Sequence, residues 1–341
     1  MKILFVGLGS IGQRHLRNIK KFYPNSKISA YRILNRKFTL SNKNKVQKDN
    51  LNKKYNIKVF KNFKESLHDK PDAIFICNPT SMHIKYALIA AKNKINIFID
   101  KPLSDKMIGI RKLHNLVKKN EIIFMVGYQM RFLKSLIYIK SIIDKKILGK
   151  LCGANIYNGE FLPDMHKYEN YRKTTMALKR LGGGVINSQI HELDYCIYLF
   201  GNPKTVYAKG GKLSNFNIDV EDYVTSSMTF QKDNISVNLN LDFFQKPPVR
   251  KMFITGTKAS LEWNYYKNEV YINYYSSNNR IRKDFGIFNR NKMFEEQTKY
   301  FFSLISKKQK KNISDLDNGI LSLKLSLLIK KSIKKNLLIK F

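Results

Sequence analysis

The chain has 341 residues, of which 43% are hydrophobic and 12% aromatic, so it is long enough for two domains and can bury a core. This composition excludes an intrinsically disordered chain, and no apolar run approaches the roughly 18 residues of a membrane-spanning helix. Cys77, Cys152 and Cys196 are widely spaced, which is typical of neither a disulfide framework nor a paired metal site. Met1 leads directly into an expected strand, so we expect no signal peptide and a cytoplasmic location.

The net charge is +38, because 63 Lys and Arg stand against 25 Asp and Glu. A nucleic-acid partner is one interpretation of such a balance. The lysines are scattered along the whole chain among many Asn and Ile residues, which share AT-rich codons, and no recognition module accompanies them. We therefore interpret the excess as a basic surface that attracts anionic ligands such as nucleotides, and we expect no nucleic-acid or membrane partner.

The stretch Lys2 to His15, KILFVGLGSIGQRH, places an apolar strand before G-x-G-x-x-G and a helical pattern after it. This order is the context that the dinucleotide-binding fingerprint requires. Gly7 allows the tight turn, Gly9 lets the backbone approach a pyrophosphate, and Gly12 lets the helix lie close to the strand. Ser10 and Ile11 begin the helix whose N–H groups would face the phosphates. The alternative is a glycine-rich turn that only packs.

A second strand, Ile28 to Tyr31, ends where an acidic residue usually binds the ribose 2′-hydroxyl. Arg32 stands there instead, with Arg36 nearby, and a guanidinium matches the geometry of a 2′-phosphate. This favours NADP over NAD, although a solvated arginine is the alternative.

Short apolar strands alternate with amphipathic segments through the first third of the chain, which predicts a parallel sheet with helices on both faces. We read 35–56 as a helix plus a loop. The strands are predicted at 58–60, 73–77, 95–99 and 122–126, with helices at 82–93 and 104–119, the latter capped by Ser104. Two polar turns, Asn78-Pro79-Thr80 and Asp100-Lys101-Pro102, follow strand ends, where open α/β sheets bind ligands.

After about Gly149 the pattern changes to longer strands, which predicts a mostly antiparallel sheet. A strand at 151–161 is followed by a polar stretch and by a helix that Gly182–Gly184 opens. Further strands are predicted at 205–210, 220–230, 235–243, 251–255 and 260–263, and helices at 293–307 and 318–334. The fold class is therefore α/β, with a Rossmann domain at 1–127 and an α+β domain with a large open sheet at 128–341, whose final helices are candidates to return to the first domain.

The motifs GLGSIGQRH, NPTSMH, DKP and GGGV…HELD, in this order, resemble the Gfo/Idh/MocA family of NAD(P)-dependent oxidoreductases over nearly the whole chain. The resemblance implies a sugar-like substrate, cofactor NADP or NAD, and a homodimer or homotetramer through the C-terminal sheet. The segment Gly182 to Tyr195 is similar to members associated with bacterial surface-glycan pathways.

Hydride transfer is the cofactor's chemistry, so the protein must orient the substrate and move a proton. A histidine suits acid–base work near neutral pH. By the resemblance, His191 serves as acid or base and Lys101 binds the substrate oxygen. Many family members carry an aspartate where Asn187 stands, and an amide cannot take a proton. Either Lys101 and His191 suffice, or Asn187, Glu192 or Asp194 assists. Asp194 lies three residues after His191, on the same helix face, and a helix-to-core hydrogen bond is its alternative role, whereas Glu192 should point elsewhere on that helix.

The resemblance also implies the remaining site residues. Asn78, Pro79, His83, Asp100, Lys101 and Gln129 are candidates for binding the cofactor, and helix capping or packing is the alternative role of His83. Arg131, Tyr171, Arg172, Asn187 and His191 are candidates for binding the substrate. No cluster of residues supports a metal site. A non-catalytic NAD(P)-binding sensor is the second hypothesis, because Asn187 replaces the usual aspartate.

Overall fold

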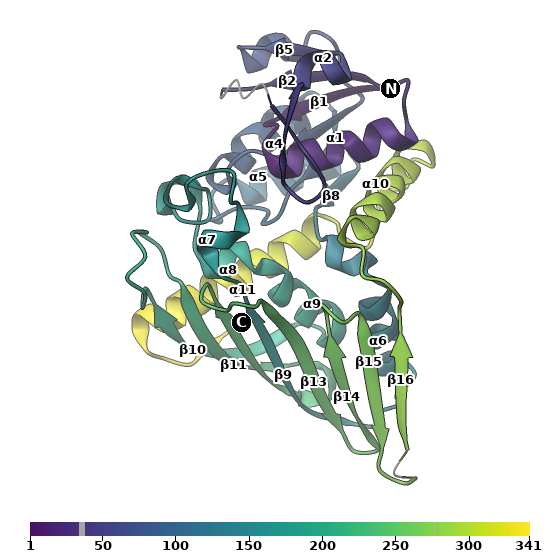
Figure 1. Cartoon of the computed structure of the whole chain (residues 1–341), viewed down its shortest axis with the longest axis vertical. Coiled ribbons are helices and arrows are strands. Elements are labelled where there is room, and N and C mark those ends of the chain that lie inside the picture. Colours follow the sequence, from purple (N-terminus) through teal and green to yellow (C-terminus); the bar gives the residue numbers. More distant parts are fainter. Residues whose placement is uncertain (34–37, 278) are drawn as a thin grey trace. The chain divides into compact units, whose positions relative to one another are not determined.

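The computed structural model describes residues 1–33, 38–277 and 279–341, which form two compact units (Figure 1). Unit 1 comprises Met1–Gln129 and Asn291–Ile320, and unit 2 comprises Met130–Arg290 and Leu321–Phe341. Within the described ranges, none of the helices combines the length and apolar character needed to cross a membrane.

Unit 1 is built on a six-stranded sheet in the order β5-β2-β1-β6-β7-β8, in which every neighbouring pair is parallel. The predicted parallel sheet is confirmed. Burial of β1 and β6 between layers explains their continuous apolar sequences. The strands are β1 (Lys2–Val6), β2 (Lys27–Tyr31), β5 (Ile57–Phe60), β6 (Ala73–Ile76), β7 (Asn96–Ile99) and β8 (Phe124–Val126).

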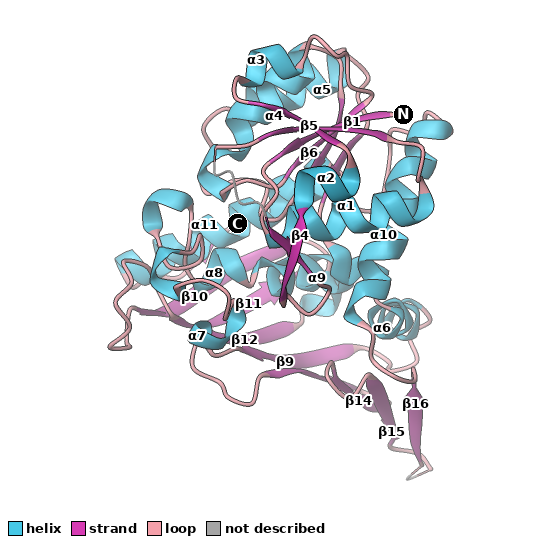
Figure 2. Ribbon diagram, turned by 45° about the horizontal axis from the view of Figure 1, so that its top comes forward, coloured by secondary structure: helices cyan, strands magenta, loops and turns pink. Residues whose placement is uncertain are grey.

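Helices lie on both sides of this sheet (Figure 2). On one side, His15 of α1 and Phe301 of α10 pack against Phe75 and Phe98 of the sheet. On the other, α4 contacts β6, β7 and α5. The helices are α1 (Ser10–Phe22), α2 (Leu51–Tyr55), α3 (Phe63–Ser66), α4 (His83–Lys92), α5 (Ile110–Lys119) and α10 (Arg290–Ser306), with short 3₁₀ turns η1 (Thr80–Met82) and η2 (Gln129–Phe132).

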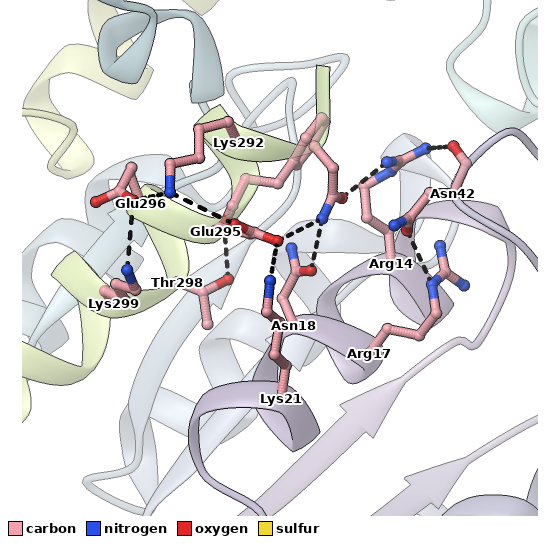
Figure 3. A network of polar contacts seen from close by, with 12 residues as sticks. Arg14, Arg17, Asn18, Lys21, Asn42, Lys292, Glu295, Glu296, Thr298 and Lys299 are labelled. Atoms are coloured by element: carbon pink, nitrogen blue, oxygen red, sulfur yellow. Dashed lines mark hydrogen bonds and ion pairs between the residues drawn. The ribbon is translucent and has the colours of Figure 1, made fainter. Parts of the chain in front are cut away.

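A polar network fixes α10 to α1, although the two helices are far apart in sequence (Figure 3). The Asn291 side chain accepts a hydrogen bond from Arg14 at 2.9 Å and donates one to Asn18 at 3.0 Å. Glu295 of α10 forms an ion pair with Lys21 of α1 at 2.9 Å. The C-terminal part of the chain thereby completes the layer on one side of the parallel sheet.

Two predictions in unit 1 were wrong. The segment 35–56, predicted as helix plus loop, contains the hairpin β3 (Phe38–Leu40) and β4 (Val46–Asn50) before α2. Side chains of α1 hold this hairpin: Gln13 accepts from the Leu40 N–H at 2.7 Å, and Arg14 donates to the Asn42 carbonyl at 2.7 Å. The helix predicted at 104–119 begins only at Ile110, because Gly109 has φ +83 and interrupts the helical backbone.

Unit 2 contains a nine-stranded sheet in the order β16-β15-β14-β13-β9-β12-β11-β10-β17. All neighbours are antiparallel except β9 and β12, which confirms the mostly antiparallel prediction. The strands are β9 (Leu151–Gly159), β10 (Pro203–Gly211), β11 (Tyr223–Phe230), β12 (Ser236–Asp242), β13 (Val249–Gly256), β14 (Ala259–Asn264), β15 (Glu269–Tyr274), β16 (Arg280–Asp284) and β17 (Ile339–Lys340).

Burial alternates along these strands, so one face of the sheet carries the core and the other carries polar side chains. Helix α6 contacts α9 and β15, and α8 contacts β11 and β12. The helices are α6 (Lys134–Asp144), α7 (Leu162–Met165), α8 (Val185–Ser188), α9 (Ile190–Phe200) and, from Leu321 onward, α11 (Leu316–Lys335), with 3₁₀ turns η3 (Tyr171–Lys173), η4 (Lys179–Leu181) and η5 (Lys232–Asn234). The single helix predicted after Gly184 is thus two helices, separated at Gln189.

Candidate functional site

The three glycines of the β1–α1 turn have different structural tasks. Gly7 has φ +91, and an added Cβ would lie 3.0 Å from the Cys77 carbonyl oxygen. A Cβ on Gly12 would lie 2.5 Å from the carbonyl oxygen of Gly7, which no real structure tolerates. A Cβ on Gly9 would meet nothing within 4 Å. The fold therefore requires glycine at positions 7 and 12, whereas Gly9 leaves open space at the start of α1.

That open space is suited to an anion. Gly9 is the N-cap of α1 and provides no side-chain cap, and the first turn of the helix, with Ser10 and Ile11, carries no acidic residue. Free N–H groups and the helix dipole favour a phosphate at such a position. The residues present thus fit the pyrophosphate of a dinucleotide.

The loop after β6 lies directly against the glycine turn, since a Cβ on Gly7 would be 3.1 Å from Asn78 Cα. Both polar atoms of the Asn78 carboxamide are buried and have no hydrogen-bond partner among the described residues. A buried unsatisfied amide is costly, which makes this side chain a candidate to bind a ligand. Pro79 follows it at the start of η1 and is partly exposed.

The turn after β7 carries Asp100 and Lys101. Burial raises the pKa of Asp100 to about 6, although the neighbouring Lys101 ammonium acts in the opposite direction. A Cβ on Gly127 would lie 3.1 Å from Asp100 Oδ1, so the strand end at β8 leaves space for this carboxyl. Lys101 is partly exposed, and Gln129 in η2 is buried.

Arg32 follows β2 and is only 7% exposed. Its guanidinium donates to the Asn52 side-chain oxygen at 2.8 Å, and burial lowers its pKa. Asn52 belongs to α2, which Asn50 caps by accepting from the N–H groups of residues 52 and 53. Arg36, the second arginine considered for a 2′-phosphate, lies outside the described residues.

In unit 2, His191 is the second residue of α9 and is 3% exposed. Asn187 of α8 donates its side-chain amide to the carbonyl oxygens of Gly182 at 3.0 Å and Gly183 at 3.3 Å. It therefore holds the glycine turn that precedes α8. A carboxylate at this position would face two carbonyl oxygens without a proton to donate, which gives a physical reason for an amide here.

Arg131 and Asp194, two further charged candidates, are joined to each other. The Arg131 guanidinium donates to both carboxylate oxygens of Asp194, at 2.9 and 2.7 Å, and the two side chains are 3% and 0% exposed. Burial raises the pKa of Asp194, while Arg131 and Ser322 oppose this shift. The pair holds both charges inside unit 2, which is the kind of helix-to-core contact considered as the alternative role of Asp194.

Sequence reasoning overlooked a second buried ion pair, between Glu192 of α9 and Arg250 of β13, at 2.8 Å. Burial opposes the charge on Arg250, but Glu192 together with Tyr265, Glu160 and Tyr195 outweighs it and raises the arginine's pKa. Asn158 of β9 lies opposite Arg250 in the sheet, is fully buried, and has neither amide atom paired among the described residues. Asn158 could have been noticed in the sequence, because it is a polar residue at an inward-facing position of the strand predicted at 151–161.

Tyr171 and Arg172 lie in η3, which contacts α7. The Arg172 guanidinium lies 4.9 Å above the Tyr171 ring, which also contacts Phe216 at 5.8 Å. Phe216 in turn contacts Phe161 and Phe244 at 5.8 and 6.0 Å. This half-buried aromatic group with a cation on it is a surface on which a sugar ring could stack.

A parallel six-stranded sheet with this glycine turn defines a Rossmann-type nucleotide-binding protein, here joined to a unit with a large open sheet. Residues 1–128 match the family model described as the oxidoreductase family with an NAD-binding Rossmann fold, and residues 136–262 match that of the GFO/IDH/MocA C-terminal domain. The chain belongs to the Gfo/Idh/MocA family.

Among curated proteins, the chain is 28% identical over 232 residues to the uncharacterized oxidoreductase YrbE of Bacillus subtilis, covering 67% of this chain and 63% of that protein. It is 26% identical over 220 residues to the myo-inositol 2-dehydrogenase of Thermotoga maritima, covering 62% and 59%. The matches thus span about six tenths of these relatives. The structure of the WlbA dehydrogenase from Bordetella pertussis with NADH and UDP-GlcNAcA has a TM-score of 0.79 at 15% identity, covering 100% of this chain and 98% of that one.

Proposed function

We propose that this chain is an NAD(P)-dependent dehydrogenase or reductase that transfers a hydride to or from a CH–OH carbon of a sugar or nucleotide-activated sugar. The observation that carries the proposal is the open space in front of the α1 N-terminus, which Gly9 leaves free. Support for the substrate class comes from relatives that are named for an inositol or crystallised with a UDP-sugar. The resemblance of the segment Gly182 to Tyr195 adds bacterial surface-glycan biosynthesis as one setting for such an activity.

A bound nicotinamide would supply the site that accepts or donates the hydride. The Lys101 ammonium would donate a hydrogen bond to the substrate oxygen and favour its negative charge. His191 would take the hydroxyl proton during oxidation or return it during reduction. Asn187 would hold the glycine turn before α8 by its hydrogen bond to Gly182 and would not transfer a proton. The cofactor would contact the three glycines, Ser10, Ile11, Asn78, Pro79, Asp100 and Gln129.

For the cofactor, NADP is the preferred ligand in this proposal. Arg32 stands at the end of β2, where no carboxylate is present to bind a ribose 2′-hydroxyl, and its hydrogen bond to Asn52 holds the guanidinium in place. A planar guanidinium is the group that binds a phosphate with two parallel hydrogen bonds.

We assign dinucleotide binding to residues 1–127 and substrate binding to residues 128–341, with Tyr171, Arg172 and His191 as substrate contacts. The polar face of the nine-stranded sheet is the surface proposed for a homodimer or homotetramer. Light scattering of the purified protein would test the assembly, and a monomer would contradict it.

The activity is tested by following nicotinamide absorbance with inositols, hexoses and UDP-hexoses, with NAD⁺ and NADP⁺ and in the reverse direction with NADH and NADPH. We expect turnover with at least one of these compounds. Lys101→Ala and His191→Ala should each lower kcat by about 100-fold or more, the range of acid–base catalysis. Unchanged turnover in both variants would overturn the mechanism, and cofactor binding without turnover would favour a non-catalytic sensor, which the amide at Asn187 first suggested.

A further inference from the structure

His83 lies between two of the loops that form the ligand-binding edge of unit 1. It is the first residue of α4 and is 1% exposed. Its Nδ1 lies 2.8 Å from the Pro102 carbonyl oxygen, and its Nε2 lies 2.9 Å from that of Asn78. Both ring nitrogens thus face main-chain oxygens, so the imidazole itself is directed at the protein and not at a ligand.

The two loops that His83 contacts have separate roles in the proposed function. Asn78 follows β6 and lies against Gly7 of the nucleotide turn. Pro102 follows β7 and is the neighbour of Lys101. Because β6 and β7 are adjacent parallel strands, with Ile76 opposite Ile99, their loops emerge side by side at one edge of the sheet. His83 is a side chain that spans this gap.

The protonation state of the ring decides how many of these oxygens can accept a hydrogen bond from it. A neutral imidazole has one N–H, so it donates to one oxygen at a time, whereas the protonated ring donates to both. Burial lowers the pKa of His83, and the carbonyls of Asn78, Pro102 and Leu103 and the charge of Asp105 oppose this shift. Two of these three carbonyls belong to the turn after Lys101 and one to the Asn78 loop. Nδ1 makes the shorter of the two contacts, at 2.8 Å against 2.9 Å, which favours the neutral tautomer that carries its proton on Nδ1, facing Pro102.

We propose that His83 is a positioning residue for the reaction: its Nδ1–H holds the Pro102 carbonyl and thereby fixes the turn that presents Lys101. This inference rests on the proposed function, in which Lys101 contacts the substrate oxygen. Catalytic groups lose effect steeply when they are displaced by about 1 Å, so a single hydrogen bond to the turn influences kcat.

Two amide variants separate the two contacts of the ring. In His83→Asn the amide nitrogen lies near the former Nδ1 and can still donate to Pro102. In His83→Gln the amide nitrogen lies near the former Nε2 and can donate only to Asn78. Both variants replace the ring by a polar amide of similar reach, so a purely structural role for the ring would affect both alike.

Hydrogen–deuterium exchange of the backbone amides gives the first readout. In His83→Gln we expect residues 100–106 to exchange about tenfold faster, the effect of losing one hydrogen bond of ordinary strength. The same residues should exchange at the wild-type rate in His83→Asn. With the sugar substrate found in the activity screen, kcat should fall about 10-fold to 100-fold in His83→Gln and less than about threefold in His83→Asn, while the KM for cofactor stays within about twofold in both. Equal effects, or the reverse order, would overturn the inference.

A double variant tests whether His83 acts through Lys101, and ¹⁵N-histidine labelling tests which ring nitrogen carries the proton. In a Lys101→Ala background, His83→Gln should cause no additional loss of kcat, because it acts through Lys101; an additive loss would contradict the inference. If either variant does not fold, the wild-type protein labelled with ¹⁵N-histidine provides the answer. The His83 ring should show a protonated, slowly exchanging Nδ1 at neutral pH, and a protonated Nε2 would overturn the assignment. Absence of any turnover would refute the proposed function, whereas the exchange and nitrogen data would still decide this inference.

Discussion

Arg131 and Asp194 form a bidentate ion pair inside unit 2, with nitrogen–oxygen distances of 2.9 and 2.7 Å. The two side chains are 3% and 0% exposed, and the Arg131 guanidinium also lies 5.0 Å from the Tyr198 ring centre. Each buried charge depends on the other, because an isolated charge in this position would lose its hydration without compensation. The pair joins η2 to α9, the helix that carries His191.

Removal of one member of this pair should therefore destabilise unit 2 strongly. We expect Asp194→Ala to lower the free energy of unfolding by about 3–5 kcal/mol, measured by denaturant titration. The matched control is Asp144→Ala, which removes an exposed carboxylate that pairs with Lys140 at 2.5 Å and should cost less than about 1 kcal/mol. An equal loss of unfolding free energy in the two variants would show that the buried ion pair stabilises the protein no more than an exposed one.

The buried imidazole of His15 should make the stability of the protein depend on pH. Its ring is buried among Phe75, Phe98 and Phe294, and neither ring nitrogen has a hydrogen-bond partner among the described residues. Burial, with smaller effects of Arg14 and Arg17, lowers its pKa from 6.5 to about 3. The folded state therefore binds fewer protons than the unfolded state between these two values. The contribution of His15 to the free energy of unfolding is therefore fully present above pH 6.5 and is lost as the pH falls toward 3.

Between pH 7 and pH 5 this single histidine should account for about 2 kcal/mol of lost stability. The variant His15→Leu removes the titrating group and keeps an apolar side chain in the same aromatic surroundings. Its unfolding free energy should vary less with pH, by about the same 2 kcal/mol, in parallel denaturant titrations. If wild type and variant lose stability in parallel on acidification, His15 is not the group responsible.

Many family members carry an aspartate where Asn187 stands, so replacing this residue tests whether the position serves the glycine turn or proton transfer. Asn187→Asp would place a carboxylate against the Gly182 and Gly183 carbonyl oxygens, and should cost about 1–3 kcal/mol of stability without raising kcat. Asn155→Asp is the matched control, since Asn155 is exposed on β9 and its side-chain oxygen accepts from Asn238. A rise in kcat for Asn187→Asp would instead show that this position takes part in proton transfer.

Cofactor preference is tested at Arg32. Arg32→Asp should weaken NADPH binding and strengthen NADH binding, because a carboxylate repels a 2′-phosphate and accepts from a ribose hydroxyl. Asn52→Asp keeps the arginine but pairs its guanidinium with a charge, so a smaller shift in the same direction is expected. Fluorescence titration of the nicotinamide measures both. Unchanged affinities in Arg32→Asp would remove Arg32 from the cofactor site.

Much of the fold was predictable because its signals are local. The strands β1, β6 and β7 are apolar runs that end in glycine or in polar turns, and the order of motifs identified both sheets. The hairpin β3–β4 was not predictable, since its sequence is polar and α1 side chains hold it. Strand β16 is exposed along its whole length and carries no apolar alternation, so it too lacked a sequence signal.

The candidate site, like the fold, was predictable only where its signals are local in the sequence. Glycine spacing identifies the nucleotide turn, because backbone geometry at Gly7 and Gly12 leaves no other residue type. Pairing between distant residues is invisible in one sequence, so neither the Arg131–Asp194 pair nor the Glu192–Arg250 pair could be foreseen. The same holds for His83, whose two contacts lie on loops that only the sheet brings together.

Binding of NADPH and NADH to the wild-type protein and to Gly9→Val tests whether the turn before α1 is the nucleotide site. A Cβ at residue 9 would meet nothing within 4 Å in the folded chain, so we expect the variant to unfold at about the wild-type denaturant concentration. It would fill the space in front of α1, so we expect affinity for both cofactors to fall by about 100-fold or more. Gly12→Val, in contrast, should lower stability because of its contact with Gly7. Failure of the wild-type protein to bind either cofactor, or undiminished binding by folded Gly9→Val, would contradict the account.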